Sequence, residues 1–116
     1  MLRVDRHTTD GVVTCRLAGE VDAFTVSQLR EALAGLVHSQ YVVLDLSKVT
    51  FIDSAGIGAL VGGIRWTREL GGEIAFACNR PVLQRLLHST GLDRIVTVAP
   101  DPPTATLEFA HPQPAA

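Results

Sequence analysis

The sequence has few cysteines, no cluster of basic residues and no long apolar run, and each shortage argues against a class of protein. Its two cysteines, Cys15 and Cys78, form no CxxC motif, so we expect buried reduced thiols rather than a disulfide framework or a redox pair. The net charge is -2 and Lys and Arg residues do not cluster, which argues against a nucleic acid as the main partner.

Membrane and metal signals are also missing. No apolar run approaches the roughly 20 residues of a membrane-spanning helix, and residues 1–6 lack the apolar core of a signal peptide. We therefore expect a cytoplasmic protein that does not bind membranes. Because the four histidines show no metal-ligand spacing to a cysteine or carboxylate, we expect no metal and no cofactor. These histidines are His7, His38, His88 and His111.

What the sequence contains is the composition of one globular domain, with 47% hydrophobic and 19% charged residues in a chain of 116. Apolar patterns predict strands at 2–7, 12–17, 41–44, 73–78 and 95–98. Helical patterns predict helices at 23–37, 54–70 and 81–90. The dipeptide Asp10-Gly11 predicts a hairpin between the first two strands. The order of these elements predicts an α/β domain with a mixed sheet and about four helices.

This single domain is expected to span residues 1–99. The polar stretch 45–50 is expected to carry the chain out of the third strand. Five of the six prolines lie in residues 100–116, so we expect a proline-rich C-terminal tail there. Within that tail, residues 106–110 are compatible with either a turn of helix or a short extended segment.

The helix expected at 54–70 has an unusual outer face. On a wheel of 3.6 residues per turn, one face carries an ordinary apolar stripe, whereas the opposite face carries nothing larger than a methyl group before a tryptophan. Each interior glycine costs roughly 1 kcal/mol relative to alanine, so we expect another surface to approach closely. Either a second helix of the same domain covers this face, or a partner protein docks on it. The face consists of Ala55, Gly58, Ala59, Gly62 and Trp66.

Ser54 lies where this helix begins, after Asp53 and before Ala55-Gly56. A serine at this position is usually a structural cap, but Asp53 adds a charge that a cap does not need, and Ala55-Gly56 leaves the first turn open. A phosphate on Ser54 would add about 1.5 to 2 negative charges beside free backbone N–H groups, which the fold would tolerate. It would also place a dianion at the rim of the docking face, which would oppose partner binding by repulsion.

The run from Val43 to Ile57 resembles the signature of STAS domains, in particular that of the bacterial anti-anti-sigma factors, also called anti-sigma factor antagonists. Gly19-Glu20-Val21-Asp22 resembles their second motif, and residues 91–95 resemble the segment leading into their last strand. The resemblance covers residues 1–99. Ala23-Phe24 departs from the family pattern because it is more apolar, which leaves the identity of the partner open.

The resemblance implies a non-enzymatic protein that binds an anti-sigma factor of the serine kinase type and so frees a sigma factor. It implies that the kinase phosphorylates Ser54, that the complex then dissociates, and that a serine phosphatase restores binding. Asp22 matches a family aspartate near the phosphorylated serine that contributes to the kinase interaction. The expected partner-binding residues are Asp22, Asp53, Ala55, Gly56, Gly58, Ala59, Gly62 and Trp66.

Three alternatives compete with this interpretation. A phospho-receiver domain needs an acidic pair for Mg²⁺ and a lysine near the last strand, whereas the only lysine is Lys48. An enzyme with Ser54 as nucleophile needs a nearby base, and the G-x-S-x-G motif is absent. The third alternative stays open: a STAS binding or scaffold module that senses a ligand, or joins a larger signalling assembly, without phosphorylation.

Overall fold

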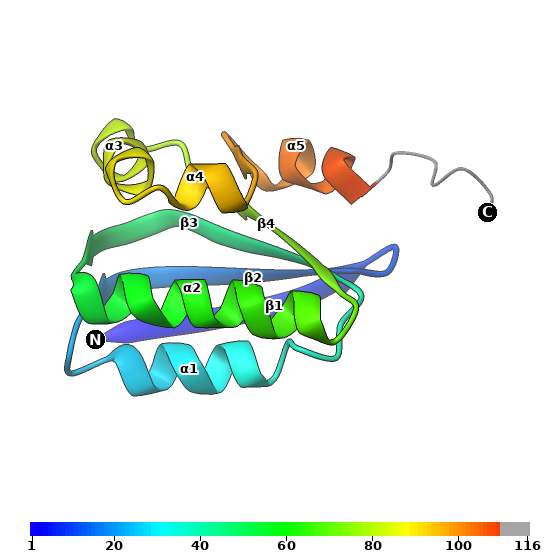
Figure 1. Ribbon diagram of the computed structural model, residues 1–116, viewed down its shortest axis with the longest axis horizontal. Helices are drawn as coiled ribbons and strands as arrows, with labels where there is room; N and C mark the ends of the chain where they lie inside the picture. The colour runs from blue at the N-terminus through cyan, green and yellow to red at the C-terminus, as the bar shows by residue number, and fades with distance from the viewer. Residues whose placement is uncertain (110–116) are drawn as a thin grey trace.

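The computed structural model describes residues 1–109 and contains one five-stranded sheet with strand order β1-β2-β3-β4-β5 (Figure 1). The strands are β1 (Leu2–Thr9), β2 (Val12–Val21), β3 (Tyr41–Ile52), β4 (Glu73–Ala77) and β5 (Val98–Ala99). The helices are α1 (Val26–Ala34), α2 (Ser54–Glu69), α3 (Pro81–Ser89), α4 (Leu92–Ile95), α5 (Pro102–Thr106) and the 3-10 helix η1 (Leu107–Phe109). β1 is antiparallel to β2 and the other pairs are parallel, which confirms the predicted mixed sheet.

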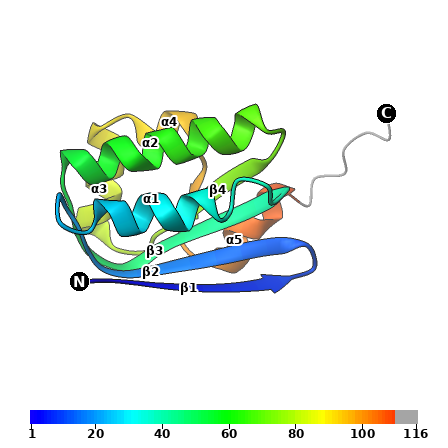
Figure 2. The same cartoon turned by 90° about the horizontal axis from the view of Figure 1, so that it is seen from below.

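Helices cover both faces of the sheet. α1 and α2 lie side by side over one face, and α5 lies against the other (Figure 2). Successive side chains of β4 point to opposite faces of the sheet, so this strand contributes to two hydrophobic clusters. Ile74 and Phe76 belong to the core beneath α1 and α2, whereas Ala75 and Ala77 belong to a second cluster that contains Ala105 of α5.

The predicted hairpin joins β1 and β2. Asp10 and Gly11 have φ angles of 53° and 80°, the left-handed values that a two-residue hairpin turn of this type requires. Thr9 therefore pairs with Val12, and the register continues to Leu2 opposite Gly19.

β3 is longer than its apolar run indicates, and the prediction that residues 45–50 leave the strand is wrong. β2 also extends to Val21 and pairs with β3 as far as Ile52, so the polar residues have a parallel neighbour to bond. Asp45 is buried, and its carboxylate accepts hydrogen bonds from Arg16 Nε at 3.2 Å and from the Ser47 N–H at 3.0 Å. A satisfied buried carboxylate can stay within a strand.

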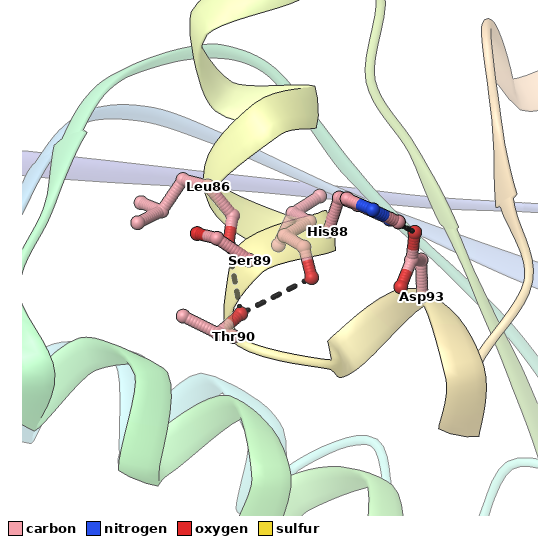
Figure 3. Close-up of polar contacts among 6 residues, drawn as sticks. Leu86, His88, Ser89, Thr90 and Asp93 are labelled. Carbon is pink, nitrogen blue, oxygen red and sulfur yellow. Dashed lines mark hydrogen bonds and ion pairs between the residues drawn. The ribbon is translucent and has the colours of Figure 1, made fainter.

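The fifth strand is also predicted wrongly, because residues 92–95 form the short helix α4 and the strand is Val98–Ala99. Gly91 has a φ of 79° and ends α3 with a left-handed turn. Figure 3 shows how the turn is held: the Thr90 hydroxyl donates to the Leu86 carbonyl at 2.9 Å, and His88 Nδ1 lies 2.7 Å from Asp93 Oδ2. These contacts turn the chain into α4 before it re-enters the sheet.

The expected tail is wrong over residues 102–106, which form α5, whereas the 3-10 helix at 107–109 agrees with the turn of helix that is one alternative for residues 106–110. Asp101 caps α5 by accepting a hydrogen bond from the Thr104 N–H at 2.8 Å, and Pro102 and Pro103 occupy the first helical positions, where proline is tolerated. Ala105 is fully buried, and Phe109 stacks on Tyr41 with ring centroids 5.0 Å apart. Residues 110–116 of the expected tail lie outside the described residues.

Candidate functional site

The candidate site lies where β2 and β3 end together. Val21 pairs with Ile52, so the residues that follow, Asp22 and Asp53, lie next to each other at one edge of the sheet. β4 ends opposite Asp45, well short of Ile52, so Asn79 leaves the sheet earlier than the other two. The site is therefore built from two segments, the loop between β2 and α1 and the start of α2.

Asp53 joins these two segments. Its Oδ1 accepts a hydrogen bond from the Gly56 N–H at 3.0 Å, which makes it the N-cap of α2. Its Oδ2 accepts from the Ala23 N–H at 3.2 Å, and its own N–H donates to the Val21 carbonyl at 3.0 Å. The charge that seemed excessive for a cap therefore has a structural use, because one carboxylate serves the helix and the loop together.

Ser54 is the first residue of α2, and its side chain is exposed. Because Asp53 supplies the cap, the fold does not need the Ser54 hydroxyl for that purpose. The hydroxyl lies at the positive end of a 16-residue helix, where added negative charge is favourable. This position combines chemical access with tolerance of a phosphate.

Asp22 shapes the loop before α1, and the prediction that the first helix begins at residue 23 is wrong. Its Oδ1 accepts hydrogen bonds from the Phe24 N–H at 2.9 Å and from the Thr25 N–H at 3.1 Å. The Thr25 hydroxyl in turn donates to the Glu20 carbonyl at 2.8 Å. This turn delays α1 until Val26, with Thr25 at the N-cap position, and α1 then ends at Ala34 instead of continuing to residue 37.

Phe24 is the residue that sequence reasoning missed as a surface feature. Its side chain is 93% exposed, the highest value among the large hydrophobic residues that are exposed. The missed signal was the spacing of Asp22 and Thr25, which is typical of a side-chain-bonded turn, and the predicted helix from Ala23 concealed it. The loop that carries Phe24 is held by hydrogen bonds at both ends, so the ring is presented on a defined backbone.

The sequence left open whether a second helix of the domain covers the outer face of α2 or whether the face is free for a partner. α1 covers one side: Ala59 is buried, and a Cβ built on Gly63 would lie 2.7 Å from Leu33 Cδ1. The other side is open, since a Cβ on Gly58 or Gly62 would meet nothing within 4 Å. Coverage by a second helix of the domain is therefore confirmed for part of this face, whereas docking of a partner over Gly58 and Gly62 stays a prediction.

Two of the expected partner-binding residues do not face outward. Gly56 is buried because α2 begins directly over the strand ends, and a Cβ there would lie 2.7 Å from Val21 Cγ1 and 2.8 Å from Ile52 Cγ2. Ala59 is 6% exposed. Gly56 is therefore not available for direct contact with a partner, whereas Ala59 lines the groove between α1 and α2, so its contact with a partner stays a prediction. Asp22, Asp53 and Ala55 are half-buried, and Ser54, Gly58, Gly62 and Trp66 are exposed.

A shallow groove of about 240 Å³ runs between α1 and α2, and we call it the α1–α2 groove. Its floor includes Gly58 and Gly62, and Trp66, which is 45% exposed, and Arg30 form its sides. The groove begins one helical turn after Ser54, so a partner seated in it would also cover the Ser54 hydroxyl.

The cysteines lie outside this site. Both are buried and free, as predicted. Burial raises the pKa of the Cys15 thiol to about 11, and burial also raises the pKa of Cys78. Because the thiolate is the reactive form, both side chains are protonated and unreactive near neutral pH.

Within residues 1–109, the helices are too short or too polar to cross a bilayer. Over the same residues, no three His, Cys, Asp or Glu side chains are grouped so that they would hold a metal ion.

The family profile, the similar sequences and the similar structure described below agree with one another. The profile of the STAS domain matches residues 3–105. The anti-sigma F factor antagonist of Paenibacillus polymyxa is 30% identical over 100 residues, which cover 84% of this chain and 86% of that protein. The anti-sigma-B factor antagonist of Listeria monocytogenes is 34% identical over 84 residues, 71% of this chain and 74% of that protein. The crystal structure of an anti-sigma factor antagonist from Mycobacterium paratuberculosis superposes with a TM-score of 0.83 at 27% identity and covers 95% of both chains.

Proposed function

Because the chain belongs to the STAS domain family, we propose that it acts as an anti-sigma factor antagonist. In its unphosphorylated form it binds an anti-sigma factor of the serine kinase type, and this binding frees a sigma factor. The kinase transfers the γ-phosphoryl group of ATP to Ser54, after which the complex dissociates. A serine phosphatase removes the phosphate and restores binding.

The observation that supports this role best is the position of Ser54. Its hydroxyl is exposed, the cap of α2 is supplied by Asp53 instead, and the open glycines of the α1–α2 groove follow on the same helix. A kinase must bring the γ-phosphorus of ATP to the Ser54 Oγ, so it must cover the start of α2. Side chains no larger than a hydrogen at Gly58 and Gly62 let the partner's surface approach the helix backbone closely.

The same geometry explains how phosphorylation would end binding. The phosphate adds about 1.5 to 2 negative charges next to the carboxylates of Asp53 and Asp22. A partner that buries this surface must then remove water from a cluster of like charges. A penalty of about 3 kcal/mol corresponds to a loss of affinity of more than 100-fold.

Phe24 supplies an apolar anchor for this interface. Rigidly presented aromatic side chains are typical of the residues that dominate binding energy in protein interfaces. Since Ala23 bonds to Asp53, the ring is tied to the start of α2 and would enter the same contact as Ser54.

The direct test is incubation of the protein with ATP and a purified anti-sigma factor of the serine kinase type. We expect radiolabel from γ-labelled ATP on the wild-type protein and none on Ser54→Ala. Ser27→Ala is the matched control, because Ser27 is also an exposed serine in the first turn of a helix, and it should be labelled like the wild type. Equal labelling of Ser54→Ala would disprove the site, and no labelling of any form would favour the binding module that works without phosphorylation.

Ser54→Glu and Ser54→Asp test the switch itself. Both variants should weaken binding to the kinase by tenfold or more in calorimetry, while the melting temperature stays within a few degrees of the wild type because the helix start tolerates negative charge. A large drop in melting temperature would show instead that Ser54 has a structural role.

A further inference from the structure

β3 has a free edge over its last residues. β4 pairs with β3 only as far as Asp45, whereas β2 pairs with the opposite edge as far as Ile52. On the β4 side, residues 49–52 therefore have no strand neighbour within the described part of the chain. α3 runs beside this stretch (Figure 1).

A groove of about 480 Å³ separates the free edge from α3, and we call it the β3–α3 groove. One side is formed by four consecutive strand residues, Val49–Ile52, and the other by α3 residues that include Val82, Arg85 and Leu86. Residues 1–109 leave its apolar surface uncovered, because Phe51 is 50% exposed and Val82 is 70% exposed. Four extended residues span roughly 13 Å, so a peptide of similar length matches this side of the groove.

We propose that the β3–α3 groove binds an extended peptide segment of a partner protein, which adds as a strand along residues 49–52. A groove between an exposed strand edge and a helix suits this mode of recognition, since the strand supplies main-chain hydrogen bonds and the helix supplies side-chain selectivity. Alternate side chains of the peptide would point toward Val82 and Leu86 of α3, so apolar residues are favoured at those positions.

Charge defines the peptide further. Arg80 and Arg85 both line the groove. The ion pairs formed within residues 1–109 are Arg16–Asp45, Arg68–Glu73 and His88–Asp93, so neither arginine is neutralised there. A carboxylate on the peptide would pair with them in charge-assisted hydrogen bonds. The carboxylate belongs either to an Asp or Glu side chain or to the C-terminus of the segment.

This site goes beyond the proposed function. The β3–α3 groove shares no residue with the α1–α2 groove, and it needs neither the Ser54 hydroxyl nor a kinase. A failure of the peptide experiment therefore leaves the antagonist role untouched, and the converse also holds.

The probe is a phage-displayed library of random heptapeptides, selected on the full-length protein. We expect enriched peptides with alternating apolar residues and at least one carboxylate, whose synthetic forms shift the backbone amide signals of residues 49–52 and of α3 in NMR spectra. Replacing a free C-terminus by the amide distinguishes a terminal carboxylate from a side-chain carboxylate. The peptide nitrogens form two alternating sets, and only one set points toward residues 49–52. N-methylation of that set should abolish binding, whereas N-methylation of the other set should leave binding unchanged.

Two variants and a control complete the test. Val82→Glu and Arg85→Glu place negative charge in the groove at exposed helical positions, and each should weaken peptide binding by about tenfold or more. Arg94→Glu makes the same charge change as Arg85→Glu on α4, outside the groove, and should bind like the wild type. Circular dichroism verifies that each variant is folded. Failure to enrich peptides, shifts that map elsewhere, or equal binding by all variants would overturn the proposal.

Discussion

At the scale of single residues, Asp53 is the group that connects the parts of the candidate site. One oxygen caps α2 through Gly56, and the other holds the loop through Ala23. Ser54 and Phe24 therefore depend on the same carboxylate for their relative placement. A phosphate on Ser54 would lie next to this carboxylate, so its negative charge would interact with the loop as well as with the partner.

Asp53→Ala should destabilise the protein. The change removes the cap of a long helix and leaves the Ala23 N–H without its acceptor, and loss of a cap alone costs about 1 kcal/mol. We expect the free energy of unfolding in urea to fall by about 1–2 kcal/mol. Ser54→Ala is the matched control at the neighbouring position and should stay within about 0.5 kcal/mol of the wild type. Equal stability of the two variants would contradict the bridging role.

Phe24→Ala should weaken binding of the kinase without changing the fold. The exposed ring makes no contribution to the core, so the melting temperature should stay constant, whereas an aromatic anchor is typically worth about 2 kcal/mol, or roughly 30-fold in affinity. Leu107→Ala is the control, since Leu107 is also exposed but lies in η1, away from the site. Calorimetric titration with the kinase gives the result, and unchanged affinity for Phe24→Ala would exclude it as an anchor.

At the scale of secondary-structure elements, α2 serves two surfaces with one stripe of small residues. Gly56 and Gly63 let the helix pack closely on the strand ends and on α1, while Gly58 and Gly62 stay open. Close internal packing therefore offsets the low helix propensity of glycine at only two of these four positions, Gly56 and Gly63. The two open glycines have no packing neighbour in the described fold, and this distinguishes them from the two glycines of the core.

Alanine substitutions should have opposite effects on stability at the open and at the packed glycines of α2. Gly62→Ala meets no neighbour and improves helix propensity, so it should raise the free energy of unfolding by up to about 1 kcal/mol. Gly56→Ala forces a methyl group against Val21 and Ile52 and should lower it by about 1–3 kcal/mol. Denaturant unfolding measures both.

Gly62→Lys extends the same prediction to binding. The long charged side chain would fill the α1–α2 groove, so pull-down by the kinase should fail while the protein remains folded. An unaffected pull-down would place the partner elsewhere on the molecule.

At the scale of the whole molecule, the sheet carries a large core beneath α1 and α2 and a small one beneath α5. The small core is made mostly of alanines from β4, β5 and α5, packed around Val43. Their small side chains let the short helix α5 lie close to the sheet, and the stacked pair of Tyr41 and Phe109 closes one end. The last helical segments are therefore part of the domain.

Removal of residues 100–116 tests this view of the domain boundary. The truncated protein would expose Val43 and the alanines of the second cluster and would lose the packing of Phe109 on Tyr41. Burial of one large apolar side chain is worth about 1.5–3 kcal/mol, so we expect a loss of stability of at least that size. A fragment of residues 1–99 as stable as the full chain would show that α5 is a dispensable addition.

The sequence by itself determined the fold class, the hairpin, the start of α2 and the candidate serine. These features depend on signals within a few residues of each other: the dipeptide Asp10-Gly11, the apolar periods of two and 3.6 residues, and the Asp53-Ser54 pair followed by glycines. Local backbone preferences and side-chain spacing are enough to specify such elements, and the family signature lies in the same short segments.

Only the tertiary structure decided how far β3 runs, where α1 begins and which small residues remain open. Asp45 stays in the strand because Arg16 reaches it from β2, and the loop of Phe24 is placed by Asp53, a residue 30 positions from Ala23. Gly62 and Gly63 are neighbours with identical local preferences, yet Leu33 of α1 covers only one of them. Contacts between residues this distant follow from the packing of whole elements, which no short stretch of sequence encodes.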